Sequence, residues 1–109
     1  MSKPIFIRPQ ASQDIDDAFL FITQDDQAAA LRFFDAVRLT LAQLGRMPGI
    51  GAIFLTTNPR LASLRKWPVK GFKRYLIFYF EHDDQVEVVR ILQASRDLSS
   101  ILDTLDEEP

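Results

Sequence analysis

One stretch decides the fold of this chain: residues 64–93, which read LRKWPVKGFKRYLIFYFEHDDQVEVVRILQ. Its apolar runs are separated by Gly71 and by a polar turn at residues 82–85, a pattern that predicts a short strand followed by a β-hairpin. The short strand covers residues 64–69, and the arms of the hairpin cover residues 72–80 and 86–93. The stretch therefore predicts the antiparallel centre of a sheet.

The length of the turn predicts how the two arms pair. A loop of two or four residues places Arg90 opposite Ile77 and Val88 opposite Tyr79, because side chains alternate along each strand, whereas a loop of three or five residues would shift this pairing by one. We expect the helices to cover the face that carries Leu76, Phe78, Phe80, Val89 and Ile91. The other face would mix bases with aromatic rings: Lys73, Tyr75, Tyr79, Val88 and Arg90.

The N-terminal part predicts a strand and two helices. Residues 5–7 form a short apolar run between two prolines, which is typical of an edge strand. Ser12 is expected to cap a first amphipathic helix, and Asp25 or Asp26 to begin a second. Gly45 is expected to end the second helix in the left-handed conformation. Two such helices joined by a few residues form an antiparallel hairpin.

The remaining segments complete one domain. Residues 45–63 are rich in glycine and proline and predict a loop with one apolar turn. Ser95 is expected to cap a last helix, whose apolar face comprises Leu98, Ile101, Leu102 and Leu105. The predicted fold of residues 1–109, with a core at about 3–105, is α+β. A short strand and a helical hairpin pack on a small, mainly antiparallel sheet, and a short C-terminal helix closes it.

Composition excludes several classes of protein. The chain has 109 residues, which suits one domain, and it has no cysteine, which removes disulfides, thiolate nucleophiles and thiolate metal sites. No apolar run approaches the ~20 residues that span a bilayer, and the N-terminus does not resemble a signal peptide. We expect a cytoplasmic protein without a membrane partner. No phosphate loop or metal-ligand pattern is present, so the sequence predicts no cofactor and no metal.

Charge is segregated along the chain. The net charge is -2, yet residues 36–80 contain eight bases and no acid. This segregation predicts a basic face for an anionic partner, whereas the acidic total argues against direct binding to nucleic acid. The alternative is a solvated basic surface. The candidate contacts for a target or a partner are Arg65, Lys66, Lys70, Lys73, Arg74, Tyr75, Arg90 and Arg96.

Two kinds of residue have open roles. The aromatic side chains near the bases, Trp67 and Tyr75 among them, either stack on a ligand or belong to the core. Arg90, in the middle of an apolar strand, either pairs with a carboxylate structurally or marks a binding site. We expect four arginines around one end of the sheet: Arg65, Arg74, Arg90 and Arg96. His82 and its acidic neighbours are read as turn residues rather than a metal site.

The chain resembles the ParE branch of the RelE/ParE superfamily of bacterial toxins over roughly residues 3–105. The positions that carry the resemblance are Arg65, Pro68, Gly71, Tyr75, Tyr79, Arg90, Arg96 and Asp97. The N-terminal helical hairpin after a short strand is also similar. The chain departs from many relatives at Gln93, where they have histidine, and at Lys73-Arg74 before Tyr75.

The resemblance implies a toxin of a type II toxin–antitoxin module, of the kind associated with plasmid stabilisation. Such a toxin inhibits DNA gyrase without chemistry of its own and is neutralised by a ParD-like antitoxin, a ribbon-helix-helix protein with an amphipathic tail. One alternative is a ribosome-dependent mRNA endonuclease of RelE type, against which the absence of histidine after His82 weighs. Another is a non-toxic binding domain with the same fold.

Overall fold

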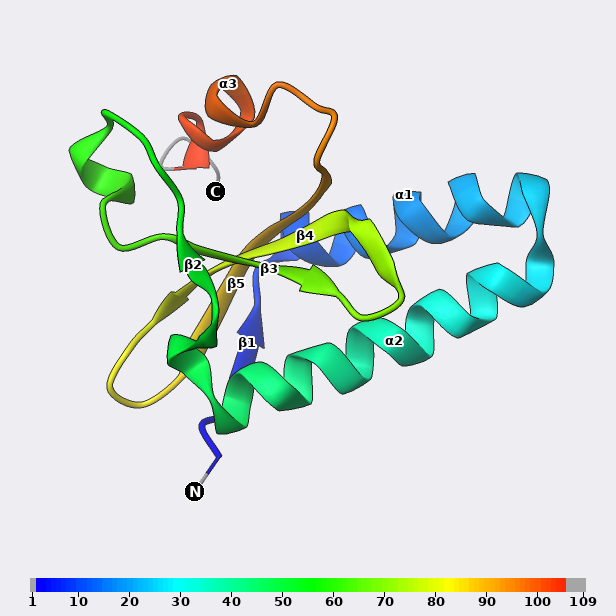
Figure 1. Ribbon diagram of the computed structural model, residues 1–109, viewed down its shortest axis with the longest axis horizontal. Coiled ribbons are helices and arrows are strands. Elements are labelled where there is room, and N and C mark those ends of the chain that lie inside the picture. The colour runs from blue at the N-terminus through cyan, green and yellow to red at the C-terminus, as the bar shows by residue number, and fades with distance from the viewer. Residues whose placement is uncertain (1, 106–109) are drawn as a thin grey trace.

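The computed structural model describes residues 2–105 (Figure 1). In chain order its elements are β1 (Ile5–Ile7), α1 (Pro9–Asp25), α2 (Gln27–Arg46), the 3₁₀ helix η1 (Pro48–Ile50), β2 (Ala52–Ile53), the 3₁₀ helix η2 (Pro59–Leu61), β3 (Arg65–Val69), β4 (Phe72–Glu81), β5 (Val86–Gln93) and α3 (Leu98–Leu102). This is the predicted α+β fold. Within the described part of the chain, no helix is long and apolar enough to cross a membrane.

The strands form a single sheet in the order β1-β5-β4-β3-β2. All neighbouring strands are antiparallel except β1, which runs parallel to β5 with Ile5 opposite Val86. The hairpin of α1 and α2 lies to one side of the sheet, and α3 lies to the other with the segment that contains η2 (Figure 1). The sheet is therefore mainly antiparallel, as predicted, and is sandwiched between two layers.

Both faces of the sheet are buried, which the alternation of side chains alone did not predict. Under α1 and α2, a first core joins Phe33, Val37 and Leu44 to strand residues that include Tyr75, Ile77 and Tyr79. Under α3, a second core contains Phe54, Leu61, Leu64, Phe78, Val89, Leu92, Leu102 and Leu105. The predicted assignment of faces is wrong, because the helical hairpin covers the face of the sheet that carries Tyr75 and Tyr79. The predicted mixed face of bases and rings is wrong too, since both tyrosines are buried.

A β-bulge divides the hairpin into two registers. Next to the turn the pairs are as predicted: Glu81 with Val86, Phe80 with Glu87 and Tyr79 with Val88. The register then shifts between Tyr79 and Phe78. Phe78 consequently lies opposite Arg90, and the predicted pairing of Arg90 with Ile77 is wrong. One extra residue on β5 reverses the alternation beyond it, so Ile91 joins the core under the helical hairpin.

Several helix ends differ from the prediction. The first helix begins at Pro9 rather than after Ser12, because proline suits the first helical position. Asp26 caps α2 as predicted, accepting a hydrogen bond from the amide of Ala29 at 3.1 Å. Gly45 does not end the helix: it lies within α2, and its carbonyl accepts from Lys3 N at 2.8 Å. A Cβ at Gly45 would stand 2.8 Å from the Lys3 carbonyl, so close packing requires this glycine.

Backbone conformation and side-chain hydrogen bonds explain the turn at Gly71 and the start of α3. Gly71, between β3 and β4, has the positive φ of 79° that a tight turn needs. Asp97, not Ser95, caps α3 by accepting from the Ser100 amide at 3.4 Å. The apolar residues predicted for the last helix, Leu98, Ile101, Leu102 and Leu105, all pack in or against the second core, but α3 ends at Leu102 and Leu105 lies beyond it.

Candidate functional site

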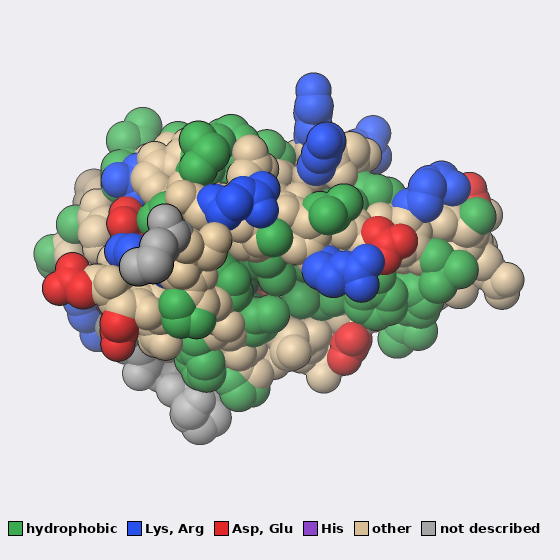
Figure 2. Space-filling view, turned by 90° about the horizontal axis from the view of Figure 1, so that it is seen from below, with side chains coloured by type: hydrophobic (Ala, Val, Ile, Leu, Met, Phe, Trp, Pro, Cys, Tyr) green, Lys and Arg blue, Asp and Glu red, His purple; other side chains and the backbone are tan. Residues whose placement is uncertain are grey.

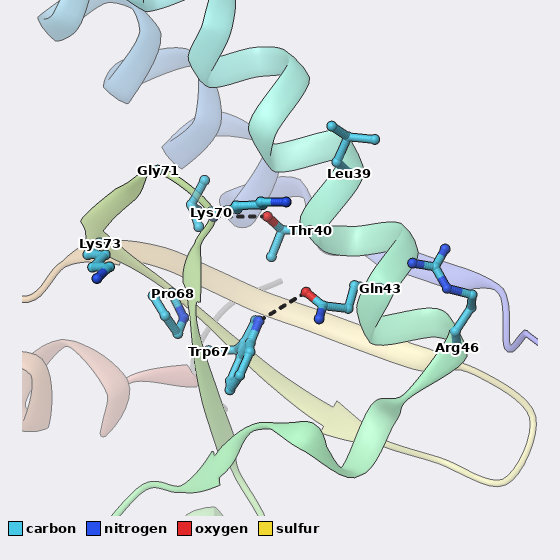
Figure 3. A pocket seen from close by; sticks show the side chains of 10 residues that line it. Leu39, Thr40, Gln43, Arg46, Trp67, Pro68, Lys70, Gly71 and Lys73 are labelled. Atoms are coloured by element: carbon cyan, nitrogen blue, oxygen red, sulfur yellow. Dashed lines mark hydrogen bonds between the residues drawn. The ribbon is translucent and has the colours of Figure 1, made fainter.

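A pocket of about 480 Å³ lies between α2 and β3 (Figure 3). Helix α2 supplies one wall, and β3 with the β3–β4 turn supplies the other. Its lining consists of Leu39, Thr40, Gln43, Arg46, Trp67, Pro68, Val69, Lys70, Gly71 and Lys73. We call it the Trp67 pocket. Three of its side chains are cationic and none is acidic.

Hydrogen bonds fix the two walls of the Trp67 pocket against each other. The Thr40 hydroxyl accepts from the backbone amide of Lys70 at 3.1 Å and donates to the Ala36 carbonyl at 2.6 Å. The indole Nε1 of Trp67 donates to Gln43 Oε1 at 3.4 Å, and the two side chains point toward one another (Figure 3). Thr40 is 1% exposed, so its hydrogen bond with the Lys70 amide is shielded from water. The pocket is thus shaped within the isolated chain.

Two further hollows adjoin the Trp67 pocket around the start of β4. The first, of about 590 Å³, shares Gly71 and Lys73 with it and adds Arg74, Tyr75 and Phe21. The second, of about 350 Å³, continues past Tyr75 and Gln93 to Arg96 and includes Asp14 and Asp17. We call the bases along these three hollows the cationic belt: Arg46, Lys70, Lys73, Arg74 and Arg96.

The cationic belt contains four of the eight residues predicted as contacts, and Tyr75 lines its middle. Tyr75 is only 8% exposed; its ring packs on Phe33 with centroids 5.0 Å apart, and its hydroxyl accepts from Gln93 Nε2 at 2.9 Å. It is a core residue whose edge reaches the belt. Phe21 on α1 is 55% exposed beside it, and no pattern in the sequence predicted that this ring would lie there.

Arg90 is a structural residue in this fold. Its Nε and Nη2 donate to the two carboxylate oxygens of Asp14 at 2.7 and 3.0 Å, and both side chains are largely buried. Asp14 Oδ2 also accepts from the backbone amide of Ile91 at 3.0 Å. The carboxylate thereby joins α1 to β5 beyond the short strand β1.

Arg65 also makes structural contacts, at the opposite end of β3 from the cationic belt. Its Nη1 donates to the carbonyl of Gly51 at 2.7 Å and to that of Gly49 at 3.3 Å. The phenol of Tyr79 holds the same loop, accepting from Gly51 N at 2.9 Å and donating to Pro48 O at 2.7 Å. Burial raises the pKa of Tyr79 above its ordinary value.

The expected cluster of four arginines is therefore wrong. Arg74 and Arg96 lie along the belt, whereas Arg65 holds the β2 loop and Arg90 pairs with Asp14. Lys66 is half-buried, opposite Phe78, and is not among the lining residues of the belt. Arg46 joins the belt because it follows Gln43 on α2, a proximity that no pattern in β3 or β4 indicates.

An apolar groove of about 620 Å³ lies near the other side of α2. Its apolar lining comprises Ile5, Ile7, Ile15, Phe34, Val37, Leu41 and Ala42. Phe34 is 39% exposed and stacks on Phe19, with ring centroids 4.4 Å apart. In the view from below, basic side chains project most prominently along the upper right edge, and hydrophobic side chains are spread over the surface, including its centre and lower edge (Figure 2).

The turn at residues 82–85 does not resemble a metal site. His82 Nε2 and Glu87 Oε1 are 2.8 Å apart, and Arg8 Nε donates to Glu87 Oε2 at 2.6 Å. Burial acts to raise the pKa of Glu87, but the hydrogen bonds from His82 and Arg8 outweigh it and hold that pKa below its ordinary value. Residues 2–105 contain no group of three histidine, cysteine or acidic residues placed to hold a metal ion.

The fold and the two hollows beside α2 define a small α+β domain with one mainly apolar and one cationic concave surface. The model of the family described as "ParE toxin of type II toxin-antitoxin system, parDE" matches residues 5–98 of this chain. The chain therefore belongs to the ParE toxin family and is a toxin of a type II toxin–antitoxin system.

One solved structure supports the fold independently. It is described as the chromosomal ParDE toxin–antitoxin system from P. aeruginosa, and it aligns with a TM-score of 0.66 over 84% of this chain and 96% of that chain. At 13% identity the likeness concerns the fold alone. No curated protein sequence matches this chain.

Proposed function

We propose that this toxin inhibits DNA gyrase and is neutralised by a ParD-like antitoxin. The observation that carries the proposal is the pair of hollows beside α2: one is lined mainly by apolar side chains, with Ser12, Asp16, Asp35 and Arg38 at its polar positions, and the other is cationic. A toxin that acts by binding needs an interaction surface for its target and one for its inhibitor, and the two hollows can provide them.

An antitoxin tail that is amphipathic and acidic suits this surface. Its apolar side chains would cover the groove beside Phe34 and Leu41, in the manner of a helix bound in a hydrophobic groove. Its carboxylates would face the bases of the cationic belt and increase the rate of association. A ribbon-helix-helix antitoxin with such a tail combines both features.

The arrangement of the belt favours binding over chemistry. Cleavage of RNA at the 2′-hydroxyl needs a proton acceptor and donor near neutrality, usually histidine. At the belt, Gln93 stands where many relatives have histidine, and its side-chain amide donates a hydrogen bond to the Tyr75 hydroxyl. His82 lies at the far end of the hairpin and is paired with Glu87. We therefore propose that the toxin is not an enzyme.

The test compares gyrase with messenger RNA as the target. Purified toxin is added to gyrase and relaxed plasmid, and to a translating extract whose transcripts are mapped. We expect loss of supercoiling and accumulation of gyrase-dependent DNA breaks, with intact transcripts. Reactions without gyrase are the control. Normal supercoiling together with cleaved transcripts would instead establish the RelE-type nuclease, and no effect in either assay would indicate a non-toxic binding domain.

A further inference from the structure

We propose that two copies of this chain form a homodimer by pairing their β2 edges antiparallel, centred on Phe54. Strand β2 ends the sheet on one side, and among residues 2–105 no further strand lies beyond it (Figure 1). In the dimer the two five-stranded sheets become one continuous sheet. The inference goes beyond the proposed function, since it involves neither gyrase nor an antitoxin.

Backbone direction is the first argument. The amide of Phe54 donates to the Leu64 carbonyl at 2.8 Å, so the pairing with β3 extends one residue past β2. Successive residues of a strand direct their backbone groups to opposite sides. The amide and carbonyl of Ile53 therefore face the open edge, and Leu55 is the next residue with that direction. Antiparallel pairing about Phe54 places Ile53 opposite Leu55 of the second copy, and hydrogen bonds join both such pairs.

The side chains at this edge are the second argument. Leu55 is 89% exposed and Ile53 is 41% exposed, although both are large aliphatic residues. They lie on the face opposite to that of Phe54, whose ring packs in the second core. In the proposed pairing, Ile53 of each copy packs beside Leu55 of the other, so four exposed apolar side chains are removed from water together.

Charge is the third argument, and it favours a second copy over an acidic partner. Residues 47–59 contain no charged side chain, between Arg46 and Arg60. At a two-fold axis each surface faces a copy of itself, so a strand with charges of one sign would repel its copy. An uncharged strand is free of that repulsion and is complementary to itself. An acidic segment, by contrast, finds no opposite charge along this strand.

Other edges of the sheet are protected against pairing, whereas the β2 edge is not. Strand β1 lies between Pro4 and Pro9. Beyond β2, the edge of β3 continues with Pro68, which has no amide hydrogen, and then with Lys70, whose amide already donates to the Thr40 hydroxyl. Residues 51–58 contain neither a proline nor a charge. Because natural proteins usually protect an exposed edge by such devices, we infer that this one is used for pairing.

Symmetry and size predict a closed but weak dimer. Two-fold pairing uses the β2 edge of both copies, so no such edge is left for a third copy. An edge of about three residues, with its flanking side chains, buries an area at or below the lower end of the roughly 1,200–2,000 Å² of stable complexes. We therefore expect reversible association at micromolar concentrations rather than a permanent dimer.

Sedimentation equilibrium of the purified full chain, from about 1 µM to about 500 µM, measures the association. We expect a monomer–dimer equilibrium. Amide hydrogen exchange, followed by NMR on isotope-labelled chain, then locates the contact. The Ile53 and Leu55 amides should exchange at least about threefold more slowly at about 500 µM than at about 20 µM. The Phe54 amide, which already donates to Leu64, is the internal control and should change less.

The variant Leu55→Lys tests the assignment to β2. It places an ammonium group opposite Ile53 of the second copy and should raise the dissociation constant of the dimer by at least about tenfold. The matched control, Leu31→Lys, makes the same change on α2 at a residue that is 62% exposed. It should associate within about twofold of wild type. Thermal melting checks that both variants are folded.

Three results would overturn the proposal: a chain that stays monomeric over the whole range, an association that Leu31→Lys weakens as much as Leu55→Lys, or open-ended oligomers in place of a dimer. Should Leu55→Lys melt early, amide exchange in the wild-type chain still decides the question, because unchanged rates at Ile53 and Leu55 would refute strand pairing. No antitoxin or gyrase is present, so a negative result leaves the proposed function standing.

Discussion

Asp14 on α1 and Arg90 on β5 form a two-point ion pair, with Nε–Oδ2 and Nη2–Oδ1 distances of 2.7 and 3.0 Å. The same carboxylate accepts from the amide of Ile91. Strand β1 pairs with β5 only as far as Val88. Beyond that point, the Asp14 carboxylate accepts the hydrogen bond of the Ile91 amide in place of a neighbouring strand. One side chain thus fixes the first helix to the sheet and compensates a buried cation.

Removing Asp14 should destabilise the fold strongly. Asp14→Ala leaves Arg90 buried without this partner and the Ile91 amide without its acceptor, at a cost of about 3–5 kcal/mol in the free energy of unfolding. Arg90→Lys keeps the charge but loses the two-point geometry and should cost less. Urea denaturation measures both variants. Asp17→Ala on the exposed face of α1 is the control, and equal stabilities of Asp14→Ala and Asp17→Ala would contradict the structural role.

The phenol of Tyr79 should contribute to stability through its hydrogen bonds. Tyr79→Phe preserves the ring but leaves Gly51 N and Pro48 O without their phenol partner, which should cost about 1–3 kcal/mol. In Tyr75→Phe only the bond from Gln93 is lost, beside a hollow that admits water, so a smaller loss is expected. Thermal and chemical unfolding compare the two. The hypothesis fails if Tyr75→Phe is the more damaging change.

Two nearby glycines provide a matched steric test. A Cβ at Gly51 would collide with the Tyr79 hydroxyl and stand 2.9 Å from the Lys66 carbonyl, whereas a Cβ at Gly49 would meet nothing within 4 Å. Gly51→Ala should therefore cost about 1–3 kcal/mol, and Gly49→Ala should change stability by less than about 1 kcal/mol. Melting temperatures of the two variants decide the matter; similar values would mean that the loop adapts to the extra methyl group.

The Glu87 carboxylate should make stability depend on acidic pH. Its pKa in the folded chain is below the ordinary value, so the ionised form stabilises the fold above the unfolded pKa of about 4.3. This contribution is lost as the pH falls through the lower native pKa. Glu87→Gln should lower stability at neutral pH and lose less stability between pH about 5 and about 3. Urea midpoints across this range, with the exposed Glu81→Gln as control, measure it; parallel curves for wild type and Glu87→Gln would refute the linkage.

Charge reversal in the cationic belt should slow binding of the antitoxin. Reversing Lys66, Lys70 and Lys73 together should reduce the association rate constant and flatten its dependence on salt. Because Lys66 does not line the belt, Lys70→Glu/Lys73→Glu should reproduce most of the effect and Lys66→Gln alone should have little. Stopped-flow association with the cognate antitoxin at low and high salt measures these rates. An unchanged rate for the triple variant at low salt would show that the belt is not the docking surface.

Local signals in the sequence predicted most elements and their order. Asp26 caps α2 because its short carboxylate reaches the amide of Ala29 without help from distant residues. Gly71 turns the chain because glycine tolerates a positive φ. The polar turn at residues 82–85 started the hairpin in the predicted register. The resemblance to the ParE family rested on such local motifs, and the family match confirms it.

Features that depend on distant contacts were not predictable in the same way. Gly45 resembles a helix stop, yet its role comes from the backbone of Lys3, more than forty positions away in the chain. The bulge at Val89 reverses the alternation of β5, and a strand with apolar residues on both sides does not reveal it. The choice between structure and binding at Arg90 required Asp14, which is 76 positions away.

By itself, then, the sequence determined the helices, the strands β1, β3, β4 and β5, their order and the family, because caps, turns and apolar periodicity act within a few residues; β2 lies in the segment 45–63 that was predicted as a loop. Only the tertiary structure decided which face the helices cover and which bases share a surface. Folding removes Arg65 and Arg90 from the candidates on that surface by giving them buried or backbone partners, and it brings Arg46 and Trp67 together with Lys70. The physical reason is that the role of a side chain depends on the groups it contacts, and in this fold those groups come from segments that are distant in the sequence.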